Sequence, residues 1–282
     1  AIAITSLVWS ESKQLHKSSR NRHKTRGSHT RMGNSHPKAQ PNTDQPASME
    51  VIRLNDAFDA YMSGPVGAPA VVVVQEWWGI NEMIKAHALK IAEQGYRVLV
   101  PDLYKGKLCL DVEEAHHNMD NLDFPGAVAE IVQAAAFLKK EGSAKVGICG
   151  FCMGGALTMG GLAKSADIVC GAPFYGVNFG LFECTQLAQK PVQGHFGAED
   201  TMAGFSDAAT GKKLAAELQA AGNAEAEVFI YERVGHAFMN SESAPFADFA
   251  ERQAKLGFPP YDASQADLAW SRLFGFFAKH LK

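Results

Sequence analysis

The residue best suited to catalytic chemistry in this chain is Cys152, which lies in the run Gly-Phe-Cys-Met-Gly-Gly at 150–155. The residues before it, 144–149, are mostly apolar, so the segment predicts a buried strand, a sharp turn and then a helix. Glycines on both sides of such a turn let the strand and the helix approach without Cβ clashes. The pattern predicts a cysteine nucleophile on a strained turn, with the backbone N–H of Met153 directed at a developing oxyanion.

A nucleophilic thiol needs a base and an acid that orients the base. His236 follows one late predicted strand, and the neighbouring acids Glu199 and Asp200 follow another. The chain order is therefore nucleophile, acid, histidine, as expected for side chains carried at the ends of successive strands. We expect His236 to take the proton of Cys152, and one of the two acids to orient the imidazole. The thiolate would then attack an ester or lactone carbonyl, and water would cleave the thioester.

Strands that alternate with helices must position these side chains. The pattern predicts a mostly parallel sheet that is covered by helices on both faces, which is the α/β class. One run at 70–74 is continuously β-branched, which is typical of a strand that is buried on both sides. The predicted strands are 51–62 (a strand or a hairpin), 70–74, 96–100, 144–149, 167–172, 190–196 and 226–231, and the predicted helices are 80–94, 112–119, 125–140, 153–163, 208–221 and 263–280.

Composition and charge indicate one domain at 49–282 that is preceded by a basic segment. The chain has 282 residues and is 46% hydrophobic, which is enough for one large core. Residues 1–48 hold eight Lys or Arg against two acids, a net charge of +6, so the remainder carries −9 of the total of −3. We interpret 1–48 as an organelle transit peptide (plastid or mitochondrion), a basic disordered arm or a non-native leader, outside the fold in each case. The acidic body argues against nucleic acid as a partner, and no apolar run is long enough for a membrane span.

The other cysteines and histidines are predicted to be structural. Cys149 and Cys152 spell C-x-x-C, for which a redox site or half a zinc site is the alternative interpretation. No second C-x-x-C is present, so we expect no metal and expect the Cys149 side chain to point away from the turn. We also expect His195 to pack near a strand end, and His116 and His117 to lie on the surface. The number of cysteines is odd, which indicates a reducing, cytoplasmic setting without disulfides. The five cysteines are Cys109, Cys149, Cys152, Cys170 and Cys184.

Five segments together resemble the dienelactone hydrolase (carboxymethylenebutenolidase-like) family of the α/β-hydrolase superfamily. The resemblance covers about residues 50–282 and implies an α/β-hydrolase fold. It also implies an intracellular, monomeric hydrolase without a cofactor, and it selects Asp200 over Glu199 as the acid of a triad with Cys152 and His236. The segments are Val-Gln-Glu-Trp-Trp-Gly-Ile-Asn at 74–81, Val-Pro-Asp-Leu-Tyr at 100–104, the run at 150–155, Gly-Ala-Glu-Asp at 197–200 and Gly-His-Ala-Phe at 235–238.

The resemblance also implies that Glu76 contacts the resting thiol of Cys152 and keeps it latent. A carboxylate near a thiol disfavours the thiolate, and its removal would release the nucleophile. The turn that contains Glu76 follows the first core strand. We therefore expect the backbone N–H of Trp77 to be the second oxyanion donor, beside that of Met153.

The chain departs from the family in the residues that would bind a substrate carboxylate. Family members that cleave dienelactone carry arginines after the Pro-Asp-Leu-Tyr and Gly-His-x-Phe motifs, where this chain has Lys-Gly-Lys at 105–107 and Met-Asn at 239–240. A lysine offers a point charge but not the bidentate fork of arginine, so another ester or lactone is the expected substrate. The expected pocket residues are Trp78, Tyr104, Lys105, Phe238 and Asn240.

Two other functions fit the same residues. A thioesterase or acyltransferase would use the same acyl-cysteine, and a hydrolase-like binding protein would use the fold without catalysis. An intact triad favours the enzyme.

Overall fold

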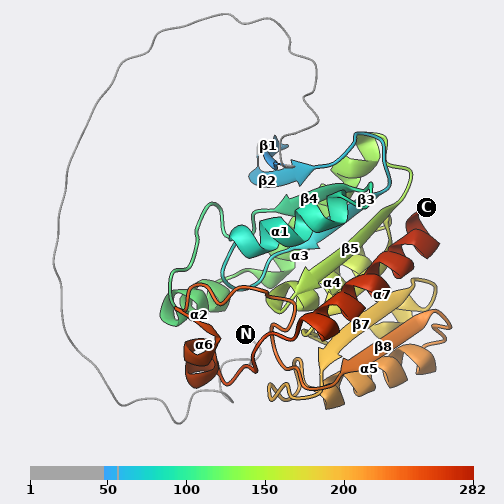
Figure 1. Ribbon diagram of the computed structural model, residues 1–282. Coiled ribbons are helices and arrows are strands. Elements are labelled where there is room, and N and C mark those ends of the chain that lie inside the picture. The colour runs from blue at the N-terminus through green and yellow to red at the C-terminus, as the bar shows by residue number, and fades with distance from the viewer. Residues whose placement is uncertain (1–47, 56) are drawn as a thin grey trace, which may run out of the picture. The chain divides into compact units, whose positions relative to one another are not determined.

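The computed structural model of the protein describes residues 48–55 and 57–282. The predicted leader at 1–48 therefore lies, apart from Ser48, outside the described residues. Within them, an eight-stranded sheet runs in the order β1-β2-β4-β3-β5-β6-β7-β8 (Figure 1). The strands are β1 (Glu50–Leu54), β2 (Phe58–Ser63), β3 (Ala70–Val74), β4 (Arg97–Pro101), β5 (Val146–Phe151), β6 (Ile168–Phe174), β7 (Val192–Gly197) and β8 (Ala226–Tyr231).

The sheet is parallel from β4 to β8, and β1 and β2 add an antiparallel hairpin at one edge. The predicted hairpin at 51–62 is confirmed. Every residue of β3, β4, β5 and β7 is buried, as expected for strands that are covered on both faces. Because the strands are parallel, their carboxyl ends share one edge of the sheet, and the loops that follow β3, β5, β7 and β8 carry the candidate site.

Helices cover both faces of the sheet. Helices α1 and α7 pack on one face, and α3, α4 and α5 pack on the other (Figure 1). This arrangement confirms the predicted α/β class. The helices are α1 (Glu82–Ala92), α2 (Val112–Asp120), α3 (Phe124–Lys140), α4 (Met153–Lys164), α5 (Ala208–Ala220), α6 (Phe249–Leu256) and α7 (Ala263–Leu281), with a 3-10 helix at Cys184–Leu187.

Two elements were not predicted from the sequence, the 3-10 helix and α6. Helix α6 is short and half polar, with Arg252 as its one buried residue. A helix of two turns with so narrow a buried face gives little periodic signal. This omission matters, because α6 lies in the segment that follows His236.

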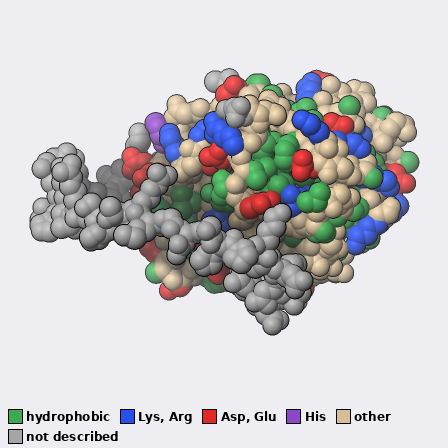
Figure 2. Space-filling view, turned by 90° about the horizontal axis from the view of Figure 1, so that it is seen from above, with side chains coloured by type: hydrophobic (Ala, Val, Ile, Leu, Met, Phe, Trp, Pro, Cys, Tyr) green, Lys and Arg blue, Asp and Glu red, His purple; other side chains and the backbone are tan. Residues whose placement is uncertain are grey.

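The surface carries charges of both signs. Figure 2 shows acidic and basic side chains interspersed around a central group of hydrophobic side chains on the visible face. Among the described residues, no helix is both long enough and apolar enough to cross a membrane.

Candidate active site

Cys152 occupies the sharp turn between β5 and α4. Its backbone has φ 56° and ψ −118°, in the left-handed region that residues other than glycine rarely adopt. The neighbouring glycines make the turn possible through close approach. A Cβ at Gly150 would lie 2.2 Å from the carbonyl oxygen of Gly154, and a Cβ at Gly154 would lie 2.4 Å from that of Val74. The strand and helix can therefore meet only if both positions lack side chains.

The structure brings Cys152, His236 and Asp200 together from three loops. The Cys152 sulfur lies 3.0 Å from His236 Nε2. On the other side of the ring, His236 Nδ1 lies 2.9 Å from Asp200 Oδ2. All three side chains are buried. This is the order of contacts that the sequence predicts: nucleophile to base, and base to orienting acid.

The surroundings of His236 favour its charged form. Burial by itself would lower the pKa of the imidazole, but the charges of Cys152 and Asp200 outweigh burial and hold that pKa well above 6.5. The contacts around the ring therefore stabilise an imidazolium.

Ser206 also reaches the histidine, although no sequence motif marks it. Its hydroxyl oxygen lies 3.0 Å from His236 Nδ1, and its side chain is fully buried. It belongs to the same loop as Asp200, between β7 and α5.

Glu76 lies within electrostatic range of His236, and both of its carboxylate oxygens are hydrogen-bonded. The Tyr175 hydroxyl donates to Oε1 at 3.1 Å, and the Asn240 amide donates to Oε2 at 3.0 Å. Burial raises the pKa of Glu76, while Asn240 and the charge of His236 oppose that rise. Among the described residues these are the hydrogen bonds of the Glu76 carboxylate, so a direct bond to the Cys152 thiol is not part of this structure. The carboxylate interacts with the triad electrostatically, through its attraction to the charged form of His236.

Helix α6 contributes an arginine that sequence analysis did not identify. Arg252 is only 4% exposed, and its Nη2 donates to the carbonyl of Pro259 at 2.8 Å. Its Nε is buried without a hydrogen-bond partner. Burial lowers the pKa of Arg252, and the charges of Glu76 and Tyr175 counteract that effect, which shows that the guanidinium lies within electrostatic range of both.

The segment that follows α6 packs against His236. The Phe258 ring lies 4.8 Å from the His236 ring, centroid to centroid. Pro259 packs against Gly235, where a Cβ would lie 2.7 Å from the proline ring. Residues 252–259 therefore form part of the wall of the site.

Aromatic side chains surround the turn after β3. The Trp77 and Trp78 rings lie 4.8 Å apart, and Trp78 meets the edge of Phe246 at 5.9 Å. Trp77 meets His116 edge to face at 4.9 Å. The prediction that His116 is a surface residue is therefore wrong in part: it is half-buried against Trp77, and burial lowers its pKa.

The other predicted pocket residues lie in different settings. The Tyr104 hydroxyl is 3.3 Å from the Met153 sulfur, directly beside the turn. Phe238 is 1% exposed and packs in the core against Tyr175. Lys105 pairs with Glu130 on α3, and its ammonium lies 4.9 Å from the centre of the Phe58 ring, so the structure does not bring it to the triad.

The remaining cysteine and histidine predictions also have a structural outcome. Cys149 is fully buried in β5, and burial raises the pKa of its thiol well above the usual range. His195, near the end of β7, is stacked on Phe174 at 4.1 Å and bonded to the Tyr231 hydroxyl at 2.8 Å. Among the residues that the structure describes, no three His, Cys, Asp or Glu side chains are grouped so as to hold a metal ion.

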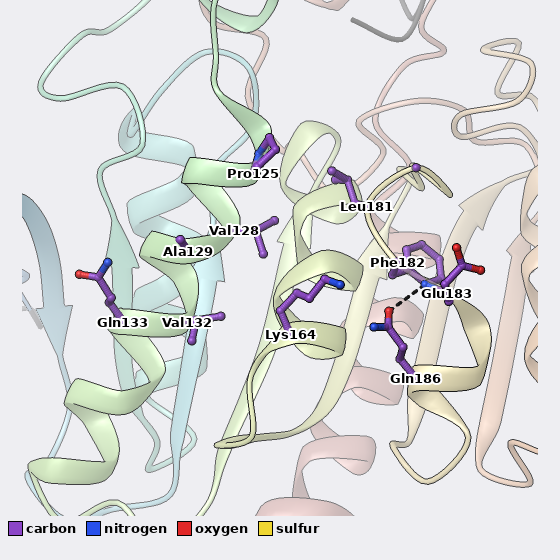
Figure 3. Close-up of a pocket in the computed structure, with 11 residues that line it drawn as sticks. Pro125, Val128, Ala129, Val132, Gln133, Lys164, Leu181, Phe182, Glu183 and Gln186 are labelled. Atoms are coloured by element: carbon purple, nitrogen blue, oxygen red, sulfur yellow. Dashed lines mark hydrogen bonds between the residues drawn. The ribbon is translucent and has the colours of Figure 1, made fainter.

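A separate groove of about 670 Å³ lies between α3 and residues 180–186 (Figure 3). Val128 and Leu181 form part of its apolar lining, and Lys164 points across it toward Glu183 and Gln186. None of the triad residues lines this groove, so it does not contribute to the site around Cys152.

Comparison with known proteins agrees with this geometry. Residues 58–281 match the dienelactone hydrolase family. A carboxymethylenebutenolidase from Pseudomonas putida is 28% identical over 204 residues, covering 67% of this chain and 84% of that protein. Protein usf from Aquifex pyrophilus is 27% identical over 225 residues, covering 76% and 90%. The crystal structure of a dienelactone hydrolase-like promiscuous phosphotriesterase from metagenomic libraries has a TM-score of 0.66 at 18% identity, covering 84% of this chain and 100% of that one, and so has the same fold.

Proposed function

Because the chain belongs to the dienelactone hydrolase family, we propose that it is a cysteine-dependent hydrolase of small esters or lactones. The observation that carries this proposal is the 3.0 Å separation of the Cys152 sulfur from His236 Nε2, in a ring whose other nitrogen faces Asp200 at 2.9 Å. A thiol that is buried only for packing does not require a histidine and a carboxylate in line behind it.

The reaction proceeds through an acyl-enzyme. The thiolate of Cys152 attacks the carbonyl carbon, and the carbonyl electrons move onto oxygen to form a tetrahedral oxyanion. When this collapses, the C–O bond to the leaving group breaks, and His236 gives its proton to the departing alkoxide. A water molecule, deprotonated by His236, then attacks the thioester. When the second tetrahedral intermediate collapses, the C–S bond breaks and the carboxylic acid leaves, so that Cys152 returns as the thiolate beside the protonated His236.

We propose two backbone amides as the donors that stabilise the oxyanion. Met153 is the first residue of α4, so its N–H lies at the positive end of the helix. Trp77 follows β3, the strand hydrogen-bonded to β5, and we assign its N–H as the second donor. Together the two donors would lower the barrier to attack at the carbonyl rather than only bind the substrate.

The substrate pocket combines aromatic walls with one buried cation. Trp78, Tyr104 and Asn240 remain proposed pocket residues, whereas Lys105 is engaged by Glu130 and Phe238 supports the site from the core. We propose that Arg252 takes the role for which the sequence offered only lysines. Its buried guanidinium lies within electrostatic range of Glu76 and Tyr175, which supports an ester or lactone that carries a carboxylate.

Hydrolysis assays on the full chain test the proposal. We expect turnover of p-nitrophenyl acetate, together with cis- or trans-dienelactone if Arg252 replaces the missing arginines. Cys152→Ala should lower turnover by about a thousandfold or more. Cys184→Ala, which removes a half-buried cysteine outside the triad, is the matched control and should keep the wild-type turnover. Turnover that survives in Cys152→Ala would overturn the cysteine mechanism, and no turnover of any ester would favour the non-catalytic interpretation.

A further inference from the structure

His236 Nδ1 has two oxygen atoms within hydrogen-bond distance rather than one. Asp200 Oδ2 lies at 2.9 Å and Ser206 Oγ at 3.0 Å. Ser206 has no solvent-exposed surface, so water does not compete for its hydroxyl. A triad of nucleophile, base and acid leaves this second contact without a role.

The protonation of the ring decides the direction of the second contact. An ionised carboxylate only accepts hydrogen bonds, so Nδ1 must carry a hydrogen toward Asp200. The same hydrogen then faces Ser206, whose hydroxyl oxygen can only accept it. The Nδ1–H group therefore makes a three-centre hydrogen bond, an arrangement that two well-placed acceptors stabilise.

One short loop holds both acceptors in place. The backbone N–H of Met202 donates to Asp200 Oδ1 at 3.0 Å, and the carbonyl of Met202 accepts from the N–H of Ser206 at 3.0 Å. The carbonyl of Phe205 accepts from Val177 at 2.9 Å, which ties this loop to the segment after β6. Asp200 and Ser206 are thus carried on one hydrogen-bonded turn.

We propose that Ser206 is a positioning residue for the catalytic histidine, its hydroxyl oxygen acting as the second acceptor of Nδ1–H so that Nε2 stays directed at Cys152. The catalytic consequence of this inference rests on the proposed hydrolase function. The positioning itself concerns only the thiol and the imidazole. Two acceptors restrict the ring more than one. They also stabilise the imidazolium that forms when the thiol gives up its proton.

Other groups that face His236 set the background for any pH effect. Cys152 and Asp200 contact the ring directly, the Tyr175 ring lies 5.2 Å from it, and Glu76 acts on it through its charge. Ser206 is uncharged at all relevant pH values. Its removal therefore changes hydrogen bonding to the ring without adding or removing a charge.

The test is the pH dependence of Cys152 alkylation by iodoacetamide, followed by mass spectrometry of the peptide that contains Cys152. This readout needs no substrate, so it stays informative even if no ester is turned over. Loss of one acceptor in Ser206→Ala should destabilise the imidazolium–thiolate pair. The alkylation midpoint should move upward by about half to one pH unit, and kcat/KM for p-nitrophenyl acetate should fall roughly fivefold to tenfold with little change in KM.

Two further variants separate positioning from packing. Ser143→Ala removes another buried serine hydroxyl, one without a hydrogen-bond partner, and should leave the alkylation midpoint unchanged. Ser206→Gly also removes the hydroxyl without adding a titratable group, so its alkylation midpoint should shift in the same direction even if Ser206→Ala does not fold. An unshifted midpoint in a folded Ser206→Ala protein, or an equal shift in Ser143→Ala, would overturn the inference.

Discussion

The side-chain amide of Asn240 donates to the carboxylate of Glu76 at 3.0 Å, although the two residues are 164 positions apart in the chain. Asn240 follows the histidine loop, and Glu76 follows the first core strand. The contact therefore joins the loop that carries the base to the turn that is proposed to carry an oxyanion donor. With Tyr175 on its other oxygen, Glu76 is held as a buried carboxylate within electrostatic range of His236.

That carboxylate should make the stability of the protein depend on pH. Burial raises the pKa of Glu76 above its usual 4.5, so the folded state holds this proton more tightly than the unfolded state. The free energy of unfolding should therefore fall as pH rises from about 4.5 through the raised pKa, and stay level above it. Glu76→Gln removes this titration, and the Asn240 oxygen, which has no partner, can accept from the new amide after a flip. Urea denaturation between pH 4 and pH 8 should show the variant gaining stability relative to wild type as pH rises.

Glu251→Gln is the control for that experiment. Glu251 lies at the surface, partly exposed, and its hydrogen bond to Lys255 lowers its pKa, so neutralising it should give no gain with rising pH. A constant difference between Glu76→Gln and wild type across the whole range would contradict the assignment of Glu76 as a raised, buried acid.

Arg252 should discriminate between charged and neutral substrates. If its guanidinium binds a substrate carboxylate, Arg252→Gln should lower kcat/KM for a carboxylate-bearing ester or lactone by about tenfold to a hundredfold, since a charge-assisted bond is worth about 1.5–3 kcal/mol. Turnover of p-nitrophenyl acetate should change far less. Arg233→Gln, which removes an exposed arginine paired with Asp262, should alter neither rate. Equal losses on both substrates would assign Arg252 to the structure of the wall instead.

The glycine at the start of α4 should not tolerate a methyl group. In Gly154→Ala the new Cβ would lie 2.4 Å from the carbonyl oxygen of Val74, so α4 must move away from β3 and displace Cys152 from His236. We expect a loss of about 2–3 kcal/mol in the free energy of unfolding and a large loss of esterase activity. Gly275→Ala provides the matched control, because nothing lies within 4 Å of a Cβ there. Because alanine favours the helix more than glycine does, Gly275→Ala in the interior of α7 should stabilise the protein by about 0.5–1 kcal/mol. Thermal melts of both variants decide the matter.

Sequence patterns predicted most of the triad because its members are marked locally. Cys152 has glycines around it, and His236 and the neighbouring acids Glu199 and Asp200 follow strands whose apolar runs are easy to recognise. The choice of Asp200 over Glu199 came from the family resemblance. Parallel strands then bring their carboxyl ends together without further information. The contacts of Cys152, His236 and Asp200 in the structure are those that this simple topology requires.

Ser206 and Arg252 could not be predicted in the same way. Ser206 lies in a loop without periodicity, and its contact depends on how the Met202 carbonyl organises that loop. Arg252 lies on a half-polar two-turn helix, where a lone arginine normally indicates a solvent-exposed face. Lys105 failed as a pocket residue for a related reason, since its partner Glu130 lies on a helix 25 positions away. Positions of this kind are set by tertiary packing rather than by local spacing.

His87 should contribute to acid sensitivity. It is buried between Phe151 and Trp270, its Nε2 donates to the carbonyl of Met239 at 3.2 Å, and burial lowers its pKa to about 4. Below pH 6.5 the unfolded chain therefore takes up a proton that the folded protein does not. Stability is lost as pH falls from 6.5 toward 4, by roughly 3 kcal/mol in all. His87→Gln keeps a donor for Met239 but cannot titrate, so its free energy of unfolding should decline less over this range. His117→Gln, at an exposed position, should follow the wild-type curve, and parallel curves for all three proteins would exclude His87 as the source.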